Sequence, residues 1–580
     1  MLARLPWRVP TIALLLAAAA VFILSWVLRY NDPEGAFGGL TDDHFFYVVQ
    51  GWQMLFGELP DRDYFDPGAP LTFAVSAALQ LLLGRSVWSE YIFCVTALSL
   101  GAAMTCVLAA RATGSIVLGV MAALFEMALL PRLYNYPKML VYAVAIATLW
   151  AWASAPRTRR TWLLAVVTAV AFLLRHDHGI YVAGAFGVLL LGMRELPWRE
   201  RVRHGVVYGL ATLLLLAPYL IYLQVNGGVE RHFVGAYGWS VRDYGRAPLR
   251  LPTLSWQPLF EEEPSDAPAS EWWNQAPFPA LSSYYTWWMY WFIMLLPAVA
   301  LLLLLVCPST GPPGWPKERV KILVVAVLLI VLNSRFLRGN LAGRLADVSV
   351  PMVILAAWSL AATGRIVRSG RIEVGTRSLM LGGAARGVIA AAALTVVLVT
   401  TAILLRPVRE LVGNSGLLEG LEQVLSNAER VTQRVQHTWP LDTWGDSGGQ
   451  VGLSRYLESC TAPTDRVLIT PHLPPVVALA QRAFAGGHMD LRAGFFGTVA
   501  EQQLTIERLE RQSVPVAIGP PGNEIEDYAE DLPLIADYLN REYVNRGDRD
   551  LGGGLVFSLL VHRGARSVRT YEPLSFPCFR

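Results

Sequence analysis

The sequence predicts a polytopic α-helical membrane protein with an α/β domain at its carboxyl end. Hydrophobic residues make up 54% of the 580 residues and charged residues only 16%, whereas soluble globular chains carry about 25% charged residues. Long apolar runs recur as far as residue 405, and about 20 apolar residues are needed for a helix to cross the hydrocarbon of a bilayer. Beyond this point Gly, Pro, Asp, Glu and Arg become common, which indicates a soluble unit.

The apolar runs predict eleven membrane spans. They lie at 11–28, 88–110, 114–130, 138–153, 161–174, 179–193, 204–223, 286–306, 319–333, 347–363 and 384–405. Segment 70–83 is a shorter twelfth candidate. We expect an odd total, eleven or thirteen, so either this segment is re-entrant or one further weak span exists. The first run follows Arg4 and Arg8 but is too long for a typical signal peptide, so we expect an uncleaved anchor.

Lys and Arg collect in four short loops, which the positive-inside rule assigns to the cytoplasm. These loops contain Arg157, Arg159, Arg160, Arg194, Arg199, Arg201, Arg203, Lys317, Arg319, Lys321, Arg365, Arg368, Arg371 and Arg377. A first loop at 29–69, a second large loop at 224–285, the connection 334–346 and the tail from residue 407 then lie on the outer side of the membrane.

We expect a membrane domain at 1–406 and a soluble extracytoplasmic α/β domain at 407–580. In the tail, β-like runs alternate with helical stretches, and strands separated by helices favour a small α/β unit. The expected strands are 467–469, 514–518 and 555–561, and the expected helices lie near 475–483, 500–511 and 532–544.

The five cysteines are too few for a disulfide framework. Cys94, Cys106 and Cys307 lie in or beside the expected spans, where we expect them only to pack. Cys460 and Cys578 both lie in the tail and could pair if that compartment is oxidising.

Several functional classes are not indicated. The formal charge of +3 is spread evenly, so nucleic acid is not an expected partner. The sequence contains no internal repeat, no glycine-rich phosphate loop and no zinc-type spacing of Cys and His.

The polar first loop carries the best candidates for a reaction centre. It contains the pair Asp42 and Asp43, then His44, and later Asp61, Asp63 and Asp66. An ionised carboxylate can take the proton of an incoming hydroxyl or bind a divalent cation. Adjacent helical residues face different ways, so Asp42 and Asp43 should divide these tasks or only one should matter, and His44 could help with either. Alternatively, Asp42 caps a helix and the other acids are solvated.

Residues 41–72 resemble the first external loop of the GT-C glycosyltransferases, specifically the bacterial branch similar to dolichyl-phosphate-mannose protein mannosyltransferase (PMT) and to aminoarabinose transferase (ArnT). The matching residues are Asp43, Tyr47, Gly57, Pro60, Asp63, Pro70 and Leu71. By this resemblance Asp43 takes the place of the catalytic Asp and Tyr47 keeps the family's Tyr. His44 stands where the family has Glu, which leaves Asp42 as a substitute acid, and a shifted alignment would make Asp42 the base.

The resemblance implies an enzyme that transfers one sugar from a polyprenyl-phosphate donor to a glycan, lipid or protein acceptor. It implies a GT-C fold of about eleven to thirteen spans in the bacterial inner (plasma) membrane, with the active site facing outward. No cofactor is certain, and a divalent cation, Mg²⁺ or Mn²⁺, is an option. Asp43 would remove the proton of the acceptor hydroxyl, and a single displacement would invert the anomeric centre.

A phosphate leaving group needs cations at the outer interface, and Arg suits multi-donor contact with phosphate. The expected substrate and phosphate site comprises Lys138, Arg175, Arg335, Arg338 and Arg344, together with Asp63 and Tyr47. The alternative for the Arg residues is ordinary snorkelling to lipid headgroups.

His176 and His178 flank Asp177 and could bind a cation with Asp43, or they could only cap a loop. Two other classes compete with the enzyme: a transporter or flippase of lipid-linked sugar, and a catalytically silent membrane scaffold. A transporter has little use for a large external tail and often carries repeated halves, which the sequence lacks.

Overall fold

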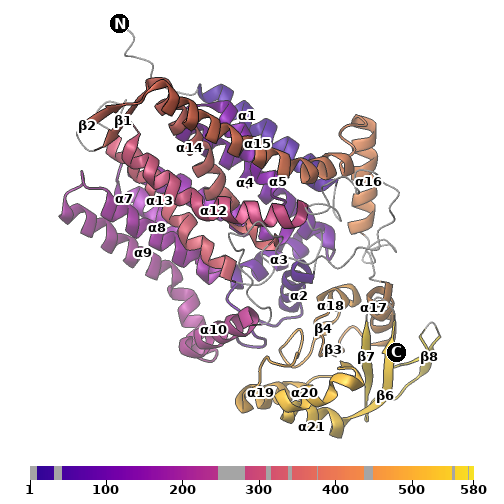
Figure 1. Ribbon diagram of the computed structural model, residues 1–580. Helices are drawn as coiled ribbons and strands as arrows, with labels where there is room; N and C mark the ends of the chain where they lie inside the picture. The colour runs from indigo at the N-terminus through magenta and orange to yellow at the C-terminus, as the bar shows by residue number, and fades with distance from the viewer. Residues whose placement is uncertain are drawn as a thin grey trace.

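The computed structural model describes residues 10–31, 42–245, 281–307, 315–337, 342–374, 377–436, 448–551, 555–572 and 574–580. A helical bundle is followed by an α/β domain that lies beyond one end of the bundle (Figure 1). The expected fold class, a polytopic helical part with a carboxyl-terminal α/β domain, is confirmed.

Each of the eleven expected spans overlaps a helix over most of its length. These helices are α1 (Thr11–Tyr30), α4 (Val87–Thr113), α5 (Ile116–Ala128), α6 (Tyr136–Ser154), α7 (Thr158–Leu174), α8 (His176–Gly192), α9 (Trp198–Val225), α12 (Leu281–Val306), α13 (Trp315–Leu332), α14 (Ser349–Ser369) and α15 (Gly383–Asn414). Six described helices, α1, α4, α9, α12, α14 and α15, are long and apolar enough to cross a membrane by length and composition. These six support the expected multi-pass membrane protein.

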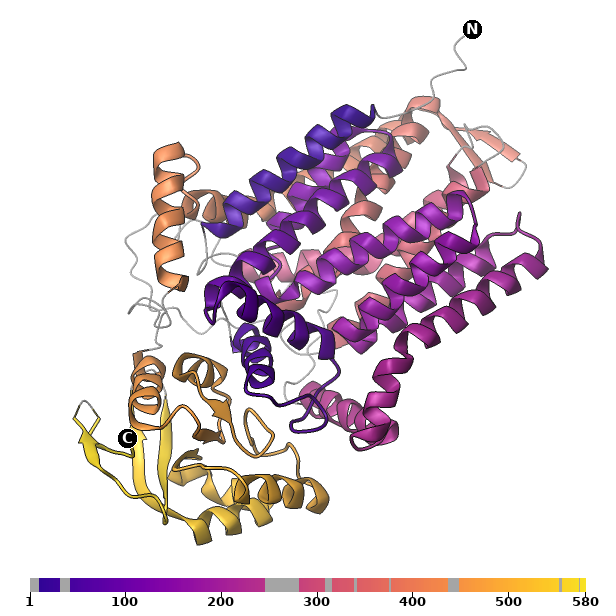
Figure 2. The same cartoon turned by 180° about the vertical axis from the view of Figure 1, so that it is seen from behind.

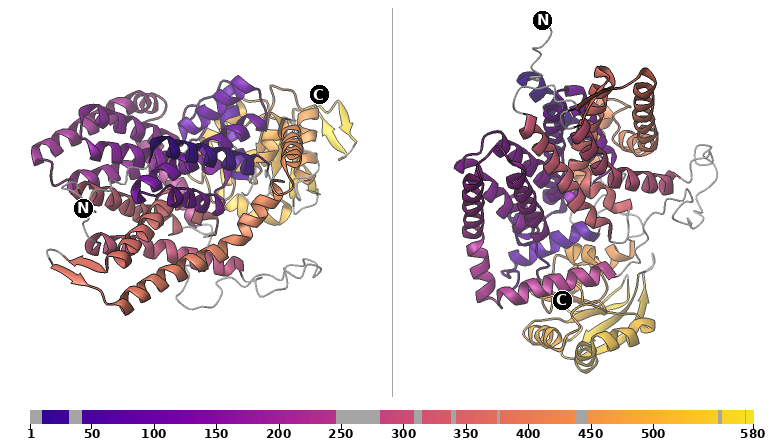
Figure 3. Two further views of the ribbon diagram at one scale, coloured as in Figure 1. Left: turned by 90° about the horizontal axis from the view of Figure 1, so that it is seen from above. Right: turned by 60° about the vertical axis from the view of Figure 1, so that its left-hand side comes forward.

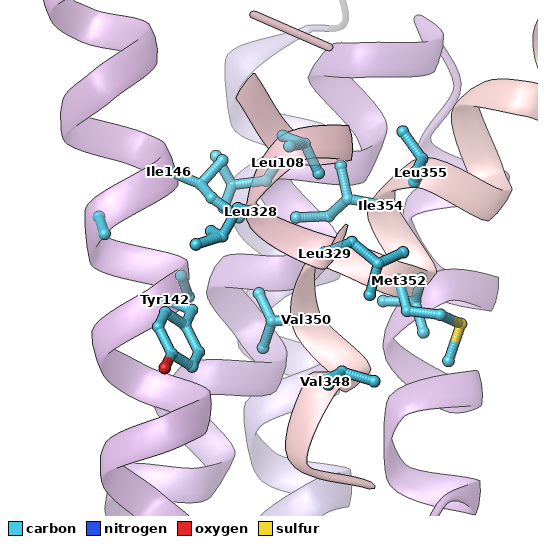
Figure 4. Close-up of a cluster of buried hydrophobic side chains, with 14 of the residues drawn as sticks. Leu108, Tyr142, Ile146, Leu328, Leu329, Val348, Val350, Met352, Ile354 and Leu355 are labelled. Atoms are coloured by element: carbon cyan, nitrogen blue, oxygen red, sulfur yellow. The ribbon is translucent and has the colours of Figure 1, made fainter. Parts of the chain in front are cut away.

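The bundle core lies where α4, α6, α13 and α14 meet. Figure 4 shows Leu108, Ile146, Leu328 and Ile354 pointing toward one another from these four helices, and all four side chains are buried. Ala residues such as Ala143 are interspersed among the large aliphatic side chains of this core. Small residues let membrane helices approach closely, which is the main source of packing energy where lipid removes the hydrophobic driving force.

Helix α3 (Pro70–Leu83) lies along one end of the bundle instead of crossing it (Figure 2). Near its start, Thr72 Oγ1 donates to the carbonyl of Leu174 at the end of α7, at 2.7 Å. Near its end, Gln80 Oε1 accepts from the backbone N–H of Ser86, just before α4, at 2.9 Å. The end of α7 and the start of α4 lie at the same end of the bundle, so segment 70–83 does not add a crossing of the bundle.

The two ends of the bundle differ in character. One end carries α2 (Asp42–Leu55), α3 and α10 (Val229–Gly245), and the tail domain lies next to it, as the right-hand view of Figure 3 shows. The other end carries the antiparallel pair β1 (Arg371–Val374) and β2 (Arg377–Met380). The four basic loops lie at the β1–β2 end, as expected if they share one side of a membrane.

The tail folds around a five-stranded mixed sheet in the order β4-β3-β5-β7-β6, with a separate pair β8 and β9. The strands are β3 (Arg466–Ile469), β4 (Ala483–Phe484), β5 (Val516–Gly519), β6 (Tyr543–Asp550), β7 (Val556–His562), β8 (Arg569–Tyr571) and β9 (Phe576–Cys578). The helices are α17 (Gly448–Cys460), α18 (Pro474–Ala480), α19 (Val499–Glu510), α20 (Ile525–Asp531) and α21 (Pro533–Glu542). The three expected strands correspond to β3, β5 and β7, and the three expected helices to α18, α19 and α21.

The expected domain boundary at 406/407 falls inside α15, which continues to Asn414. The next helix, α16 (Leu421–Gln436), packs back on the bundle, where Tyr30 and Thr432 hydrogen-bond through their hydroxyls at 2.7 Å. The α/β fold therefore begins only at Gly448.

The cysteines behave as the sequence suggested. Cys460 at the end of α17 and Cys578 in β9 form a disulfide that ties the last strand to the first helix of the domain. Cys94, Cys106 and Cys307 are free and buried in the bundle.

Candidate active site

The first loop turns back on itself immediately after α2. Gly57 has a φ of +88°, a left-handed conformation that favours glycine. The carboxylate of Asp63 accepts from the backbone N–H of Leu59 at 2.8 Å and pairs with Arg62 at 2.6 Å. Buried Tyr64 donates to the carbonyl of Gln50 at 3.1 Å. Asp63, expected at the substrate site, thus closes this turn in the structure.

The tail domain fixes the position of the first loop. The Gln53 side chain accepts from the N–H of Phe484 in β4 at 3.1 Å and donates to its carbonyl at 3.2 Å, as a neighbouring strand would. Glu58 pairs with Arg466 at 2.6 Å, and the N–H of Phe65 donates to the carbonyl of Gly487 at 3.0 Å. Helix α2 is therefore held between the bundle and the tail.

The first group of charges lies where α8 begins. Arg175 contacts both carboxylate oxygens of Asp177, with Nε at 3.0 Å and Nη2 at 2.7 Å. Arg335, which lies in the short 3₁₀ helix Asn333–Leu337 after α13, donates to the same carboxylate at 2.6 Å. The Arg335 guanidinium also lies over the ring of Tyr181, 5.6 Å from its centroid. Asp177 thereby orients two guanidinium groups.

The second group of charges lies where α6 and α14 begin. Lys138 Nζ is 2.7 Å from Asp347 Oδ2, and both groups are buried. Arg344 approaches the same oxygen at 3.9 Å, and Asn135 donates to the other oxygen at 3.1 Å. Arg344 keeps more solvent exposure than its partners, so its guanidinium is the most accessible of this group.

The two groups form one cluster. Lys138 is close enough to Arg175 and Arg335 to be repelled by them, and Arg335 is attracted by Asp347. Counted at their formal charges, the four cations and the two carboxylates, Asp177 and Asp347, leave an excess of two positive charges. The side chains of Lys138 and Arg335 are buried. Those of Arg175 and Arg344 are half-buried and form the accessible side of the cluster, which we call its front. We call these four side chains the cation cluster. Arg338, the fifth expected cation, lies outside the described residues.

Tyr47 of α2 faces this region. Its ring centroid lies 6.3 Å from that of Tyr134 and 6.1 Å from that of Phe73. Arg132 donates to the hydroxyl of Tyr134 at 2.7 Å, which adds a guanidinium that sequence reasoning did not select. Tyr47 also interacts electrostatically with Arg175. The first loop and the cation cluster are therefore neighbours, as the expected site requires.

The expected acids lie at the start of α2. Asp42 and Asp43 belong to its first turn, but their side chains lie outside the described residues. His44 is 1% exposed, and neither ring nitrogen has a hydrogen-bond partner among the described residues. Burial lowers the pKa of His44 to about 3, so the ring is neutral at physiological pH. His44 cannot supply a second negative charge at this site.

His176 and His178, expected as cation ligands, hydrogen-bond to different tyrosines. His178 Nδ1 hydrogen-bonds to the hydroxyl of Tyr142 at 2.7 Å, whereas His176 Nε2 lies 3.3 Å from the hydroxyl of Tyr219. In the described ranges no three residues among His, Cys, Asp and Glu are grouped so that they could hold a metal ion. These two imidazoles therefore do not share a site.

A second buried polar network lies beside the first. Asp61 Oδ1 is 2.7 Å from His232 Nδ1, and His232 Nε2 is 3.2 Å from the hydroxyl of Tyr219, which continues to His176. Asp66 accepts from the backbone N–H groups that follow it, at 2.7 and 2.8 Å. Burial, assisted by the negative charge of Asp61, raises the pKa of Asp66 to about 7.

Sequence reasoning did not assign Asp177 and Asp347 to the expected phosphate site, although these two acids organise the cluster. Asp177 was visible between two histidines, and Asp347 follows Arg344 by three residues, a spacing that brings side chains together on helical backbone. His232 lies in the second large loop and carried no local signal. Only the packing of α8, α10 and α14 brings these residues to the first loop.

The solved structures that are similar to this chain include two of ArnT from Cupriavidus metallidurans. The structure bound to undecaprenyl phosphate has a TM-score of 0.48 and 13% sequence identity, and the match covers 96% of this chain and 98% of that chain. The apo structure has a TM-score of 0.43 and 11% identity, and the match covers 95% of this chain and 97% of that chain. No family model matches the chain, and no curated protein matches it.

Proposed function

We propose that this protein is a membrane glycosyltransferase that transfers a sugar from a polyprenyl-phosphate donor to an acceptor on the outer side of the bacterial inner membrane. The observation that carries the proposal is the cation cluster, which has an excess of two positive charges next to the acidic first loop. An isolated buried excess of charge is costly, so a cluster of this kind favours an anionic ligand.

A phosphate group fits the front of the cluster. Arg175 and Arg344 present guanidinium donors there, and hydrogen bonds between charged groups are shorter and stronger than neutral ones. The carboxylate of Asp177 holds Arg175 through two contacts, so little reorganisation is needed when the ligand arrives. Fixed donors aimed at developing negative charge stabilise a departing phosphate most effectively where water is excluded.

Asp43 acts as general base in this proposal. Residues four apart on a helix share a face, so position 43 lies on the side of α2 that carries Tyr47 and adjoins the cation cluster. Asp43 takes the proton of the acceptor hydroxyl, whose oxygen attacks the anomeric carbon while the bond from that carbon to the phosphate oxygen breaks. The electron pair leaves with the phosphate, which Arg175 and Arg344 bind. One displacement inverts the anomeric centre, with Asp42 as the alternative base.

The polyprenyl chain would lie in the bilayer beside the bundle. The acceptor is a glycan, a lipid or a protein that approaches from the side of the tail domain. The proposed step does not use Mg²⁺ or Mn²⁺, because His176 and His178 hydrogen-bond to different partners and the excess positive charge repels a further cation. Activity that survives EDTA treatment is therefore expected, and restoration by Mn²⁺ after a loss would contradict this.

The test compares surface glycans and polyprenyl-phosphate sugars by mass spectrometry in cells with the intact gene, without it, and with Asp43→Asn or Asp43→Glu. We expect one glycosylated product to disappear and one donor to accumulate without the gene and with Asp43→Asn, while Asp43→Glu retains some product. Equal amounts of the variants in the membrane fraction serve as the control. Normal product with Asp43→Asn and Asp42→Asn together would indicate a transporter or a scaffold instead.

A further inference from the structure

A second charged site lies at the opposite end of the bundle. A cavity of about 1090 Å³ opens there between α4, α6, α13 and α14, near the β1–β2 end seen in Figure 1. Its lining includes the basic residues Arg111, Lys321, Arg365 and Arg368 and a single acid, Glu318.

Three of these cations are available to a ligand. Lys321 pairs with Glu318 at 2.7 Å, whereas Arg111, Arg365 and Arg368 form no ion pair with a described residue. Deeper in the cavity the lining is apolar, with Leu100, Met104, Leu108, Ala147 and Trp150 from α4 and α6. A ligand that fits both parts has an anionic head and a hydrocarbon tail.

The depth of this site matches a lipid headgroup. Arg365 follows Asp347 of the cation cluster by 18 residues, almost all of them in α14, and at about 1.5 Å per residue the separation along the helix is about 27 Å. Arg111 follows Tyr91, which lies at the outer end of α4, by 20 residues, or about 30 Å. The hydrocarbon core of a bilayer is about 30 Å thick. The guanidinium groups therefore lie at the headgroup level of the other leaflet.

We infer that this cavity binds an anionic glycerophospholipid of the leaflet opposite the proposed active site. Its phosphate contacts Arg111, Arg365 and Arg368, and an acyl chain packs on the apolar wall between α4 and α6. Basic pockets between membrane helices recognise anionic headgroups in this way. A free phosphate ion would use the same guanidinium groups but would leave the apolar wall uncovered. This inference does not depend on the proposed glycosyltransferase activity.

The test measures lipids retained by the full-length protein in native mass spectrometry, with dioleoyl phosphatidylglycerol or dioleoyl phosphatidylcholine added in detergent. We expect phosphatidylglycerol to be retained at least fivefold more than phosphatidylcholine. Substitution of Arg111, Arg365 and Arg368 together by Gln should abolish this preference. The matched control replaces Arg159, Arg194 and Arg199 by Gln, three exposed arginines that do not line the cavity, and should retain it.

A second variant keeps all cations in place. A Cβ added at Gly364 meets no heavy atom within 4 Å, and Gly364 lines the cavity, so Gly364→Phe should fill the cavity without strain. Gly209 has the same open surroundings but does not line the cavity, so Gly209→Phe is its control. Loss of bound phosphatidylglycerol in Gly364→Phe but not in Gly209→Phe supports the inference. Equal retention in both glycine variants and in both arginine variants overturns it. Displacement of the lipid by millimolar inorganic phosphate would assign the site to a soluble anion and also overturn it.

Discussion

Arg344 offers the cleanest test of the cation cluster, because its removal leaves no buried charge without a partner. Its guanidinium is 3.9 Å from Asp347, which keeps its contact with Lys138 at 2.7 Å and with Asn135 at 3.1 Å. Arg344→Gln should therefore fold normally. The change removes one of the two accessible guanidinium groups and halves the excess positive charge of the cluster.

The expected loss follows from the strength of a charged hydrogen bond. Such a bond contributes about 1.5–3 kcal/mol, and about 1.4 kcal/mol corresponds to a tenfold change in an equilibrium constant. We expect Arg344→Gln to weaken binding of undecaprenyl phosphate by roughly 10- to 150-fold. The affinity of Arg344→Lys for undecaprenyl phosphate should lie between those of wild type and Arg344→Gln, since Lys keeps the charge but not the planar set of donors.

The assay titrates purified protein in nanodiscs with undecaprenyl phosphate and records binding and melting temperature for each variant. Arg199→Gln serves as the control, because Arg199 is exposed at the opposite end of the bundle and lies outside the proposed site. Affinities of Arg344→Gln and Arg199→Gln that agree within twofold, with both proteins folded, would refute the assignment of the cluster to phosphate.

Three further outcomes follow from buried contacts of the site. Lys138→Met leaves Asp347 buried without its closest cation and should destabilise the protein by about 3–5 kcal/mol, whereas the double change with Asp347→Leu should recover most of this loss in a thermal melt. Gly68 has a φ of +101°, and an added Cβ would lie 2.6 Å from a ring nitrogen of His176, so Gly68→Ala should lower both melting temperature and activity; a melting temperature equal to wild type would contradict this. The pKa of Asp66 is raised to about 7 in the folded protein and is about 3.9 in the unfolded chain. Between these two pH values the folded protein binds a proton that the unfolded chain does not bind. The protonated carboxyl therefore stabilises the fold fully below about pH 4, and this stabilisation is lost as the pH rises toward 7. The melting temperature of wild type should therefore fall between pH 5 and pH 8 relative to Asp66→Asn, and parallel curves would exclude this carboxyl as the titrating group.

Much of the fold could be predicted from composition and periodicity. A run of apolar residues such as 384–405 has only one stable arrangement in lipid, a helix, and α15 covers this run. The short strands near 467 and 556 were visible because they are almost entirely apolar and buried. Strand β6 was not, because most of its side chains are exposed and its central residues Arg546 to Asp548 are polar. Its pairing with β7, not its own sequence, makes it a strand.

The candidate site could be predicted only in part, for a related reason. Lys138, Arg175, Arg335 and Arg344 stood out because cations are costly near apolar spans, and the structure brings these four together. Asp63 stood out for its charge alone, and its contact with the N–H of Leu59 depends on the turn that follows α2. The local sequence indicates which charged side chains are costly to place near an apolar span. It does not indicate which oppositely charged side chain will pair with each of them.

The tail domain belongs to the architecture of the site. Phe45, Val48, Val49 and Trp52 of α2 are buried in one cluster with Leu453, Tyr456 and other residues of the tail. Without the tail, this face of α2 would meet water, and the helix that carries Asp43 would keep only its contacts with the bundle, such as that of Tyr47 with Phe73 of α3. The bundle holds the cation cluster, and the helix that carries Asp43 packs on the tail, so the reaction we propose depends on the two domains meeting across the first loop.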